Sequence, residues 1–242
     1  MAIDKPPGWM LVPDAWKRTG WNLQAGLSSS IRQGAFWAKS RHLRFLRFVH
    51  RLDAETTGVL LLAKSPGAVA PYSAMFESRR MEKVYLAVVQ GVAAQVEWSS
   101  KLPLAPDTQA PGRMRVDERR GKEAETAFRV LQSRNGTSLI EAHPLTGRTH
   151  QIRVHLAASG CPVIGDSLYG SSTGGPHIGL GLRAVSLAYR DPFTRRRVRI
   201  EAPTKAFLNQ YGFQQGFGEK GCGVDRRSRS APTRWEPADR AG

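Results

Sequence analysis

Hydrophobic positions along this chain group into short, strand-like runs separated by turn signals. Residues 59–63, between Gly58 and the turn at Ser65-Pro66, form an apolar run rich in leucine, which is typical of a buried strand. Further along, Arg134-Asn135-Gly136 separates two strand-like segments, and an Asn-Gly pair is a strong hairpin signal. The strands predicted from these patterns cover residues 59–64, 83–91, 123–131, 137–142, 182–189 and 196–201.

Other segments repeat their apolar residues at helical spacing. Leu23, Leu27 and Ile31 recur every four residues, and Thr149 precedes a segment that ends just before Gly160. A threonine before a helix caps its first amides, and a glycine is common just past its end. The helices predicted in this way cover residues 21–33, 66–79, 149–158 and 204–211. Proline and glycine break up residues 92–121, for which we predict a hairpin or loop excursion over the sheet.

The net charge narrows the range of partners. The chain has 242 residues, a formal charge of +16 and a pI near 10.7. Such an excess of lysine and arginine indicates a polyanionic partner. A membrane surface is the alternative, but neither a basic amphipathic helix nor a lipidation signal is present, so the charge favours nucleic acid. The two cysteines suggest no disulfide framework, and we expect a soluble, cytoplasmic protein without membrane contact.

Candidate chemistry gathers just before the first apolar run. Asp53 lies in the loop that leads into the buried strand, where reactive groups are often presented. The alternative is an aspartate that only caps the turn. Upstream, residues 41–49 interleave arginines, Arg47 among them, with aromatic residues, a pattern that suits contacts with phosphates and bases. The alternative there is a strand end with solvated arginines.

Three other types of site fit the sequence poorly. His150 and His155 are five residues apart on the predicted helix, so they diverge and predict no metal site. Asp53 and Glu55 would point in opposite directions in an extended chain, which argues against the paired acids of a glycosidase. The order His50-Arg51-Leu52-Asp53 differs from the His-Arg-Asp of a kinase, and no glycine-rich phosphate loop precedes it.

Four motifs occur in order along the chain: residues 50–64, which begin His50-Arg51-Leu52-Asp53, and residues 83–87, 147–156 and 162–170. Together they resemble the motifs of the RluA family of RNA pseudouridine synthases, and residues 50–64 are similar to the family's catalytic motif. The resemblance covers about residues 3–210. Thr57 stands where the family usually has serine, and Arg183 where histidine is common.

The resemblance implies a role for each site residue. Asp53 is implied as the essential catalytic aspartate, Tyr85 as the residue that stacks on the target base, and Arg153 as the partner of the Asp53 carboxylate. An arginine within about 4–6 Å favours the ionised carboxylate. Arg51 is implied to enter the RNA stem where the uridine is flipped out. The remaining RNA-binding candidates are His50, Arg47 and Arg148.

These observations predict one α+β domain, with a mixed, mainly antiparallel sheet flanked by helices, over residues 1–213. Residues 214–242 are predicted to be a basic, disordered tail. Because the motifs begin almost at residue 1, we expect no separate N-terminal RNA-binding domain of the S4 type. We expect a monomer that isomerises uridine in an rRNA or tRNA stem-loop without metal or cofactor. The alternative is a catalytically silent RNA-binding or RNA-chaperone protein of the same fold.

Overall fold

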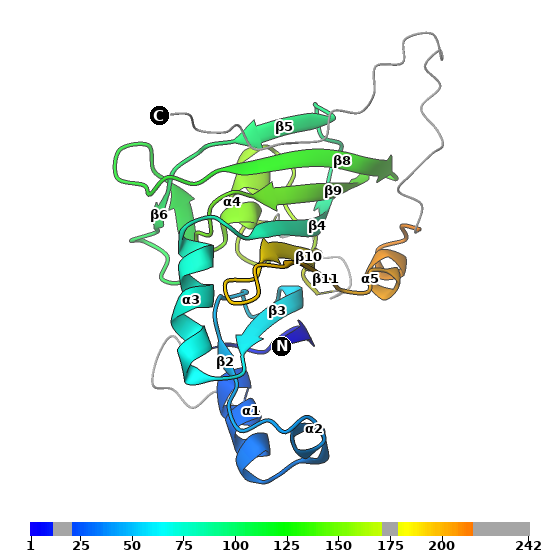
Figure 1. The fold of residues 1–242 in the computed structure, drawn as a ribbon. Coiled ribbons are helices and arrows are strands. Elements are labelled where there is room, and N and C mark those ends of the chain that lie inside the picture. Colours follow the sequence, from blue (N-terminus) through cyan, green and yellow to red (C-terminus); the bar gives the residue numbers. More distant parts are fainter. Residues whose placement is uncertain (12–20, 171–178, 215–242) are drawn as a thin grey trace.

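A nine-stranded, mixed sheet runs through the part of the chain that this computed structural model describes, residues 1–11, 21–170 and 179–214. Along the sheet the order is β1-β3-β10-β4-β9-β8-β5, with β2 paired to β3 and β11 paired to β10 (Figure 1). Only β3 and β10 run parallel, so the predicted mixed, mainly antiparallel sheet is confirmed. The strands are β1 (Ala2–Lys5), β2 (Arg47–Phe48), β3 (Thr57–Ala63), β4 (Glu82–Gln90), β5 (Glu97–Ser100), β8 (Thr126–Arg134), β9 (Thr137–Pro144), β10 (Leu182–Arg190) and β11 (Arg197–Glu201).

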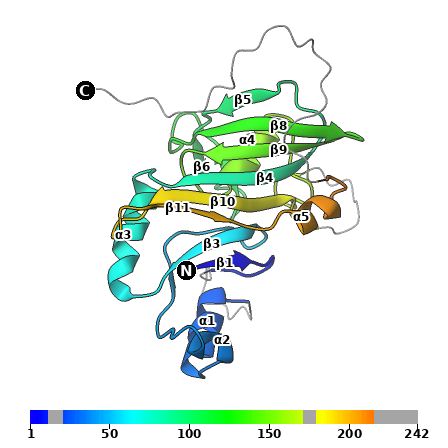
Figure 2. The ribbon, with the colours of Figure 1, turned by 45° about the vertical axis from the view of Figure 1, so that its right-hand side comes forward.

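Helices cover both faces of the sheet (Figure 2). Alternate residues of β4 divide between two cores: Ala87 and Val89 pack with helix α4, whereas Leu86 and Val88 pack with helix α5. The side chains of β3 alternate in the same way: one set packs against α3 and the other against α1. Because both faces of the strand are buried, its sequence is apolar at consecutive positions. The helices are α1 (Leu23–Arg32), α2 (Phe36–Lys39), α3 (Pro66–Glu77), α4 (Gln151–Ala158) and α5 (Lys205–Gln210).

One local prediction is wrong, and another is confirmed with more detail than the sequence predicted. Thr149 does not cap α4: the N-cap is His150, whose backbone is left-handed (φ 53°), and the Gln151 side chain accepts the Arg148 N–H instead. Within residues 92–121, the predicted hairpin is confirmed, and the segment also supplies a strand to the main sheet. It contains β5, which pairs with β8 in the main sheet, and a small hairpin of β6 (Leu104–Pro106) and β7 (Met114–Val116). Strand β5 forms because it pairs with β8, which is distant in the sequence, and its own short sequence shows no periodicity that would predict a strand.

Two further expectations, the disordered tail and the absence of membrane contact, can be compared only with the described residues. Almost all of the predicted tail, residues 215–242, lies outside them. Within the described ranges, no helix has the length and hydropathy needed to cross a bilayer.

Candidate active site

A cleft of about 490 Å³ opens between the loop before β3, the end of α3, the start of β4 and the start of α4. The fold brings six of the seven predicted site residues to its walls, from segments far apart in the sequence. Those six are Asp53, Tyr85, Arg153, Arg51, His50 and Arg148. Arg47 is exposed on β2 and does not line the cleft.

Asp53 is held by side chains rather than by the turn it occupies. The Nη1 atom of Arg153 donates a hydrogen bond of 3.5 Å to its Oδ2 atom, and the Nε2 atom of His150 lies 3.9 Å from the same oxygen. Among the described residues, no backbone amide donates to this carboxylate, and no hydrogen bond or ion pair reaches its Oδ1 atom. The side chain is 17% exposed, so it is reachable from the cleft. The geometry therefore argues against the turn-cap alternative.

A buried lysine fixes the loop that carries Asp53. The ammonium of Lys5 donates to the carbonyls of Pro6, Ala54 and Thr56, at 3.0, 2.5 and 3.0 Å. Burial lowers the pKa of Lys5 to about 8, although Glu55 and Asp53 act to raise it. Strand β1 thus anchors the loop on both sides of Glu55.

Arg153 has a stronger partner than Asp53. Its guanidinium forms two hydrogen bonds of 2.7 Å with the carboxylate of Asp166, whose side chain is fully buried. It also lies 5.1 Å from the ring centroid of Tyr169. Burial is the largest single influence and opposes the charge of both Arg153 and Asp166, but the hydrogen bonds and the charge attractions together outweigh it. The pKa of Arg153 is therefore raised and that of Asp166 is lowered. The bidentate pair fixes the guanidinium, which then presents Nη1 to Asp53.

Tyr85 lies on β4 with its ring between two core clusters and the cleft. Burial, and secondarily the charge of Asp53, raise the pKa of its phenol. The phenol is therefore protonated at neutral pH. Its implied role as a stacking platform for the base stays a prediction.

The rim of the cleft is basic. Lys83 donates to the Thr146 carbonyl at 2.7 Å, and its pKa is lowered to about 8 by burial and by Arg79. Arg148 donates to the Glu123 carbonyl at 2.8 Å, while Arg51 is exposed. These cations suit a polyanion that approaches the cleft, so the RNA-binding candidates at its rim stay predictions that the geometry favours.

His50 is part of the frame of the site. Its Nε2 atom accepts the Leu61 N–H at 2.9 Å, and its ring stacks on Phe76 with centroids 4.3 Å apart. Burial, and then the charge of Lys83, lower its pKa to about 3. A neutral imidazole thus ties the loop that carries Asp53 to β3, and the predicted RNA contact of His50 stays a prediction.

Sequence reasoning missed four residues of the site: Lys5, His150, Asp166 and Tyr169. Asp166 and Tyr169 lie inside the motif at 162–170, and His150 lies inside the motif at 147–156. The motifs could therefore have indicated these three residues as members of the site, but not which side chains they contact. Within the described residues, no three His, Cys, Asp or Glu side chains converge as metal ligands would.

Comparisons with known proteins agree with this geometry. Residues 1–158, which include Asp53, Tyr85 and Arg153, match the family described as RNA pseudouridylate synthase. Two curated relatives carry the name ribosomal large subunit pseudouridine synthase C. The one from Vibrio vulnificus (strain CMCP6) is 36% identical over 213 residues, covering 84% of this chain and 62% of the relative. The one from Escherichia coli (strain K12) is 36% identical over 189 residues, covering 74% and 59%.

Solved structures show the same fold. Human RNA pseudouridylate synthase domain containing 1 superposes with a TM-score of 0.66 at 26% identity, covering 84% of this chain and 78% of that one. Human RNA pseudouridylate synthase domain containing 4 gives 0.68 at 22% identity, covering 86% and 87%. The present chain spans roughly three fifths of the length of the curated relatives described above. The matched family, the ordered motifs and the shared fold lead to one conclusion: the chain belongs to the RNA pseudouridine synthases of the RluA family.

Proposed function

We propose that this protein converts uridine to pseudouridine in structured RNA and that its substrate is large-subunit ribosomal RNA. One observation supports the proposal: the carboxylate of Asp53 lines a basic cleft, with Oδ2 held by Arg153 and with no hydrogen bond or ion pair to Oδ1 among the described residues. That arrangement leaves Oδ1 available to a substrate.

The reaction suits a site of this kind. The N1–C1′ bond of uridine breaks, the base turns over, and C5 joins C1′. The proton on C5 leaves to solvent and N1 gains a proton, so nothing is oxidised or reduced. A free carboxylate oxygen can either attack C1′ or take a proton from the ribose. Arg153 and its partner Asp166 keep that carboxylate in place throughout.

Substrate access requires that the base leave its stack. Extruding a base costs a few kcal/mol, which the protein recovers through contacts with the flipped base and the flanking phosphates. In this cleft, Tyr85 offers an aromatic face beside Asp53, and the rim supplies Arg51, Arg148 and Lys83 as cations. The volume of about 490 Å³ is sufficient for one nucleotide.

Ribosomal RNA is proposed over transfer RNA because the curated relatives are named for the ribosomal large subunit. The other candidate function is a catalytically silent RNA-binding or RNA-chaperone protein. A binding surface alone has no need of a buried Arg153–Asp166 pair aimed at Asp53, so the geometry favours the enzyme.

A tritium-release assay tests both parts of the proposal. Transcripts of large-subunit rRNA and bulk tRNA, each carrying uridine labelled at C5, are incubated with the wild-type chain and with Asp53→Asn. We expect release from the rRNA by the wild type and none by Asp53→Asn. Release from tRNA alone would overturn the proposed substrate, and no release from any RNA would overturn the activity.

A further inference from the structure

His150 occupies a strained position between Asp53 and Tyr169. Its φ and ψ of 53° and 17° are left-handed, which is uncommon for a residue other than glycine, and such outliers cluster at functional sites. This backbone places the imidazole with Nδ1 2.8 Å from the Tyr169 hydroxyl and Nε2 3.9 Å from Oδ2 of Asp53. The side chain is 13% exposed, so water reaches little of it.

The hydrogen bonds of Tyr169 favour one tautomer of this ring. The backbone N–H of Met114, on β7, donates to the Tyr169 hydroxyl at 2.7 Å. The hydroxyl also carries a proton of its own, and His150 Nδ1 is its remaining partner among the described residues. Donation from the Tyr169 O–H to Nδ1 is the arrangement that gives this proton an acceptor. In that arrangement the imidazole proton is on Nε2, the atom that faces Asp53.

Burial keeps the His150 ring neutral. Asp53, Asp166, Arg153 and Arg51 all act on His150, and their effects partly cancel. Burial is the largest influence and lowers the pKa of His150, Asp53 raises it, and Arg153 lowers it again. The ring is thus a neutral N–H donor near neutral pH rather than a cation that competes with Arg153.

We propose that His150 is a positioning residue for Asp53. With its Nε2–H tautomer set by Tyr169 and by the Met114 amide, it directs a donor at Oδ2 beside that of Arg153, which turns Oδ1 toward the substrate. This role rests on the proposed function. The 3.9 Å between Nε2 of His150 and Oδ2 of Asp53 is longer than a hydrogen bond. Active-site contacts are often long in the absence of substrate and shorten when a substrate binds.

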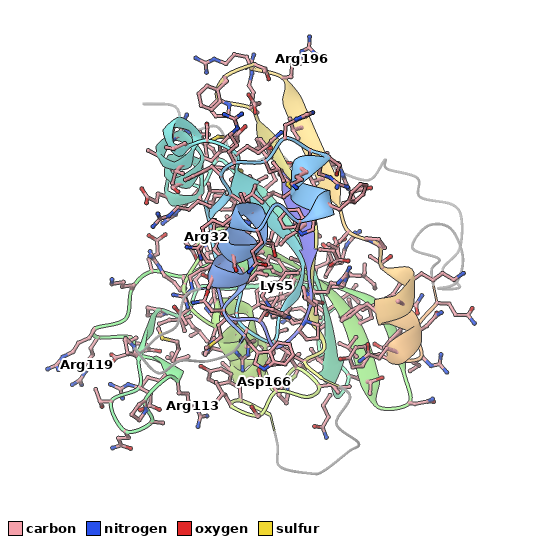
Figure 3. The ribbon with its side chains drawn as sticks, turned by 90° about the horizontal axis from the view of Figure 1, so that it is seen from below. Lys5, Arg32, Arg113, Arg119, Asp166 and Arg196 are labelled. Carbon is pink, nitrogen blue, oxygen red and sulfur yellow. The ribbon has the colours of Figure 1, made fainter. Side chains whose placement is uncertain are left out.

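The chain of contacts extends beyond the cleft. Arg113, the residue before Met114, has its guanidinium 5.3 Å from the ring centroid of Tyr169, on the opposite end of this network from Asp53. In Figure 3, Arg113 and Asp166 both lie in the lower part of the view, and Arg119, which follows β7, lies further from the centre. The β6–β7 hairpin therefore holds Tyr169 through both its backbone and a side chain.

Nitrogen NMR of histidine-labelled protein tests the tautomer without any RNA. We expect His150 in the wild type to show the neutral Nε2–H signature at neutral pH, with its signals assigned by their loss in His150→Asn. Tyr169→Phe removes the donor to Nδ1 and should shift the ring toward the Nδ1–H tautomer. A wild-type ring that is Nδ1–H or doubly protonated would overturn the proposal, as would a Tyr169→Phe spectrum identical to that of the wild type.

Steady-state kinetics test the positioning. We expect His150→Asn and Tyr169→Phe to lower kcat for tritium release by tenfold or more, with KM for the RNA changed less than threefold. Asparagine tolerates left-handed backbone, so His150→Asn tests the ring rather than the strain. The matched control is Tyr211→Phe, which removes a phenol that bonds the Gly179 carbonyl. We expect it to retain wild-type kinetics.

The two measurements separate failure of this inference from failure of the proposed function. A wild type without tritium release overturns the activity, while the NMR spectrum still decides the tautomer. An active wild type whose kcat is unchanged in both variants overturns the positioning role, and so does a change confined to KM. Equal melting temperatures for the variants and the wild type show that the comparison concerns folded protein.

Discussion

At the scale of single residues, the site is defined by the hydrogen bonds and ion pairs that orient each side chain. The four motifs name Asp53 and Arg153, yet the shortest contacts of Arg153 go to Asp166, thirteen residues further along. That pairing depends on how the segment after α4 folds back on the helix, and no sequence spacing encodes it. Lys5 shows the same limit, because its three acceptors are backbone carbonyls. Roles carried by a motif can be predicted, whereas contacts to backbone atoms cannot.

Breaking the buried ion pair should cost both stability and activity. Asp166→Asn keeps the shape and the Oδ1 acceptor for the Leu168 and Tyr169 amides, but leaves Arg153 without its charged partner. Removing one member of a buried pair costs about 3 kcal/mol or more. We expect a loss of this size in urea unfolding, together with a lower kcat because Nη1 is no longer fixed.

A solvent-exposed pair is the control for this measurement. Glu201→Gln breaks the contact of Glu201 with Arg199, in which both side chains are well exposed, and should cost less than about 1 kcal/mol. Equal losses for the two variants would contradict the account of Asp166.

His50 should make stability depend on pH. Its folded-state pKa is about 3, below the value of about 6.5 in an unfolded chain. Below pH 6.5 the unfolded chain binds the proton and the folded chain does not, so stability is full above that pH and falls as the pH drops toward 3. Between about pH 6.5 and 5 the expected contribution is about 2 kcal/mol. His50→Gln keeps an acceptor for the Leu61 amide and should flatten this part of the curve.

Urea unfolding at a series of pH values measures the effect. His42→Asn is the control, because the His42 side chain is exposed and asparagine suits its left-handed backbone. A pH slope that is the same in His50→Gln and in the wild type would show that His50 does not titrate as described.

At the scale of secondary-structure elements, periodicity was most informative where a strand or helix packs on both sides. The buried run that became β3 and the Asn-Gly hairpin between β8 and β9 are confirmed, with Asn135 and Gly136 both at positive φ. Strand β5 was not predicted, because its partner β8 lies far along the chain. The β6–β7 hairpin was predicted only as a hairpin or loop within residues 92–121, without the bounds of its strands. The helix at 149–158 was predicted correctly but not its capping, which the Gln151 side chain supplies.

The element that places the catalytic loop depends on one glycine. Gly58, the second residue of β3, has a φ of 108°, and a Cβ atom there would lie 2.0 Å from the Ala184 carbonyl oxygen on β10. Neither backbone can move, since this is the parallel contact that joins two parts of the sheet. We therefore expect Gly58→Ala to be destabilised by more than about 3 kcal/mol, or to be insoluble.

Gly67 provides the matched control within α3. A Cβ atom there meets nothing within 4 Å, so Gly67→Ala should unfold at the same urea concentration as the wild type or slightly higher. Wild-type stability of Gly58→Ala would contradict the close approach of β3 and β10.

At the scale of the whole molecule, the formal charge of +16 predicts the class of partner but not the place where it binds. The fold supplies that place by bringing Arg51, Lys83 and Arg148 to one cleft. Arg47, predicted from its interleaved pattern, lies outside the cleft on β2, while the neighbouring Phe48 packs into the core. In this pair the arginine faces solvent and the aromatic residue faces the core, which agrees with the alternative of a strand end with solvated arginines.

The charge should appear in the salt dependence of RNA binding. Each phosphate contact contributes about 0.7 to 0.9 to the slope of log affinity against log salt. We expect Arg51→Gln to lower the slope by about that amount in a filter-binding titration. Arg196→Gln is the control, because Arg196 lies on the turn between β10 and β11, at the opposite end of Figure 3 from Asp166. Equal slopes for Arg51→Gln and the wild type would remove Arg51 from the RNA interface.

The central claim is that Asp53 performs chemistry on an RNA that the rest of the cleft binds. Single-turnover conversion of a large-subunit rRNA fragment, measured beside the affinity for the same fragment, tests it most directly. We predict that Asp53→Asn binds the fragment within about threefold of the wild type, because the cationic rim is intact, and yields no pseudouridine. Conversion by Asp53→Asn at the wild-type rate would contradict the claim.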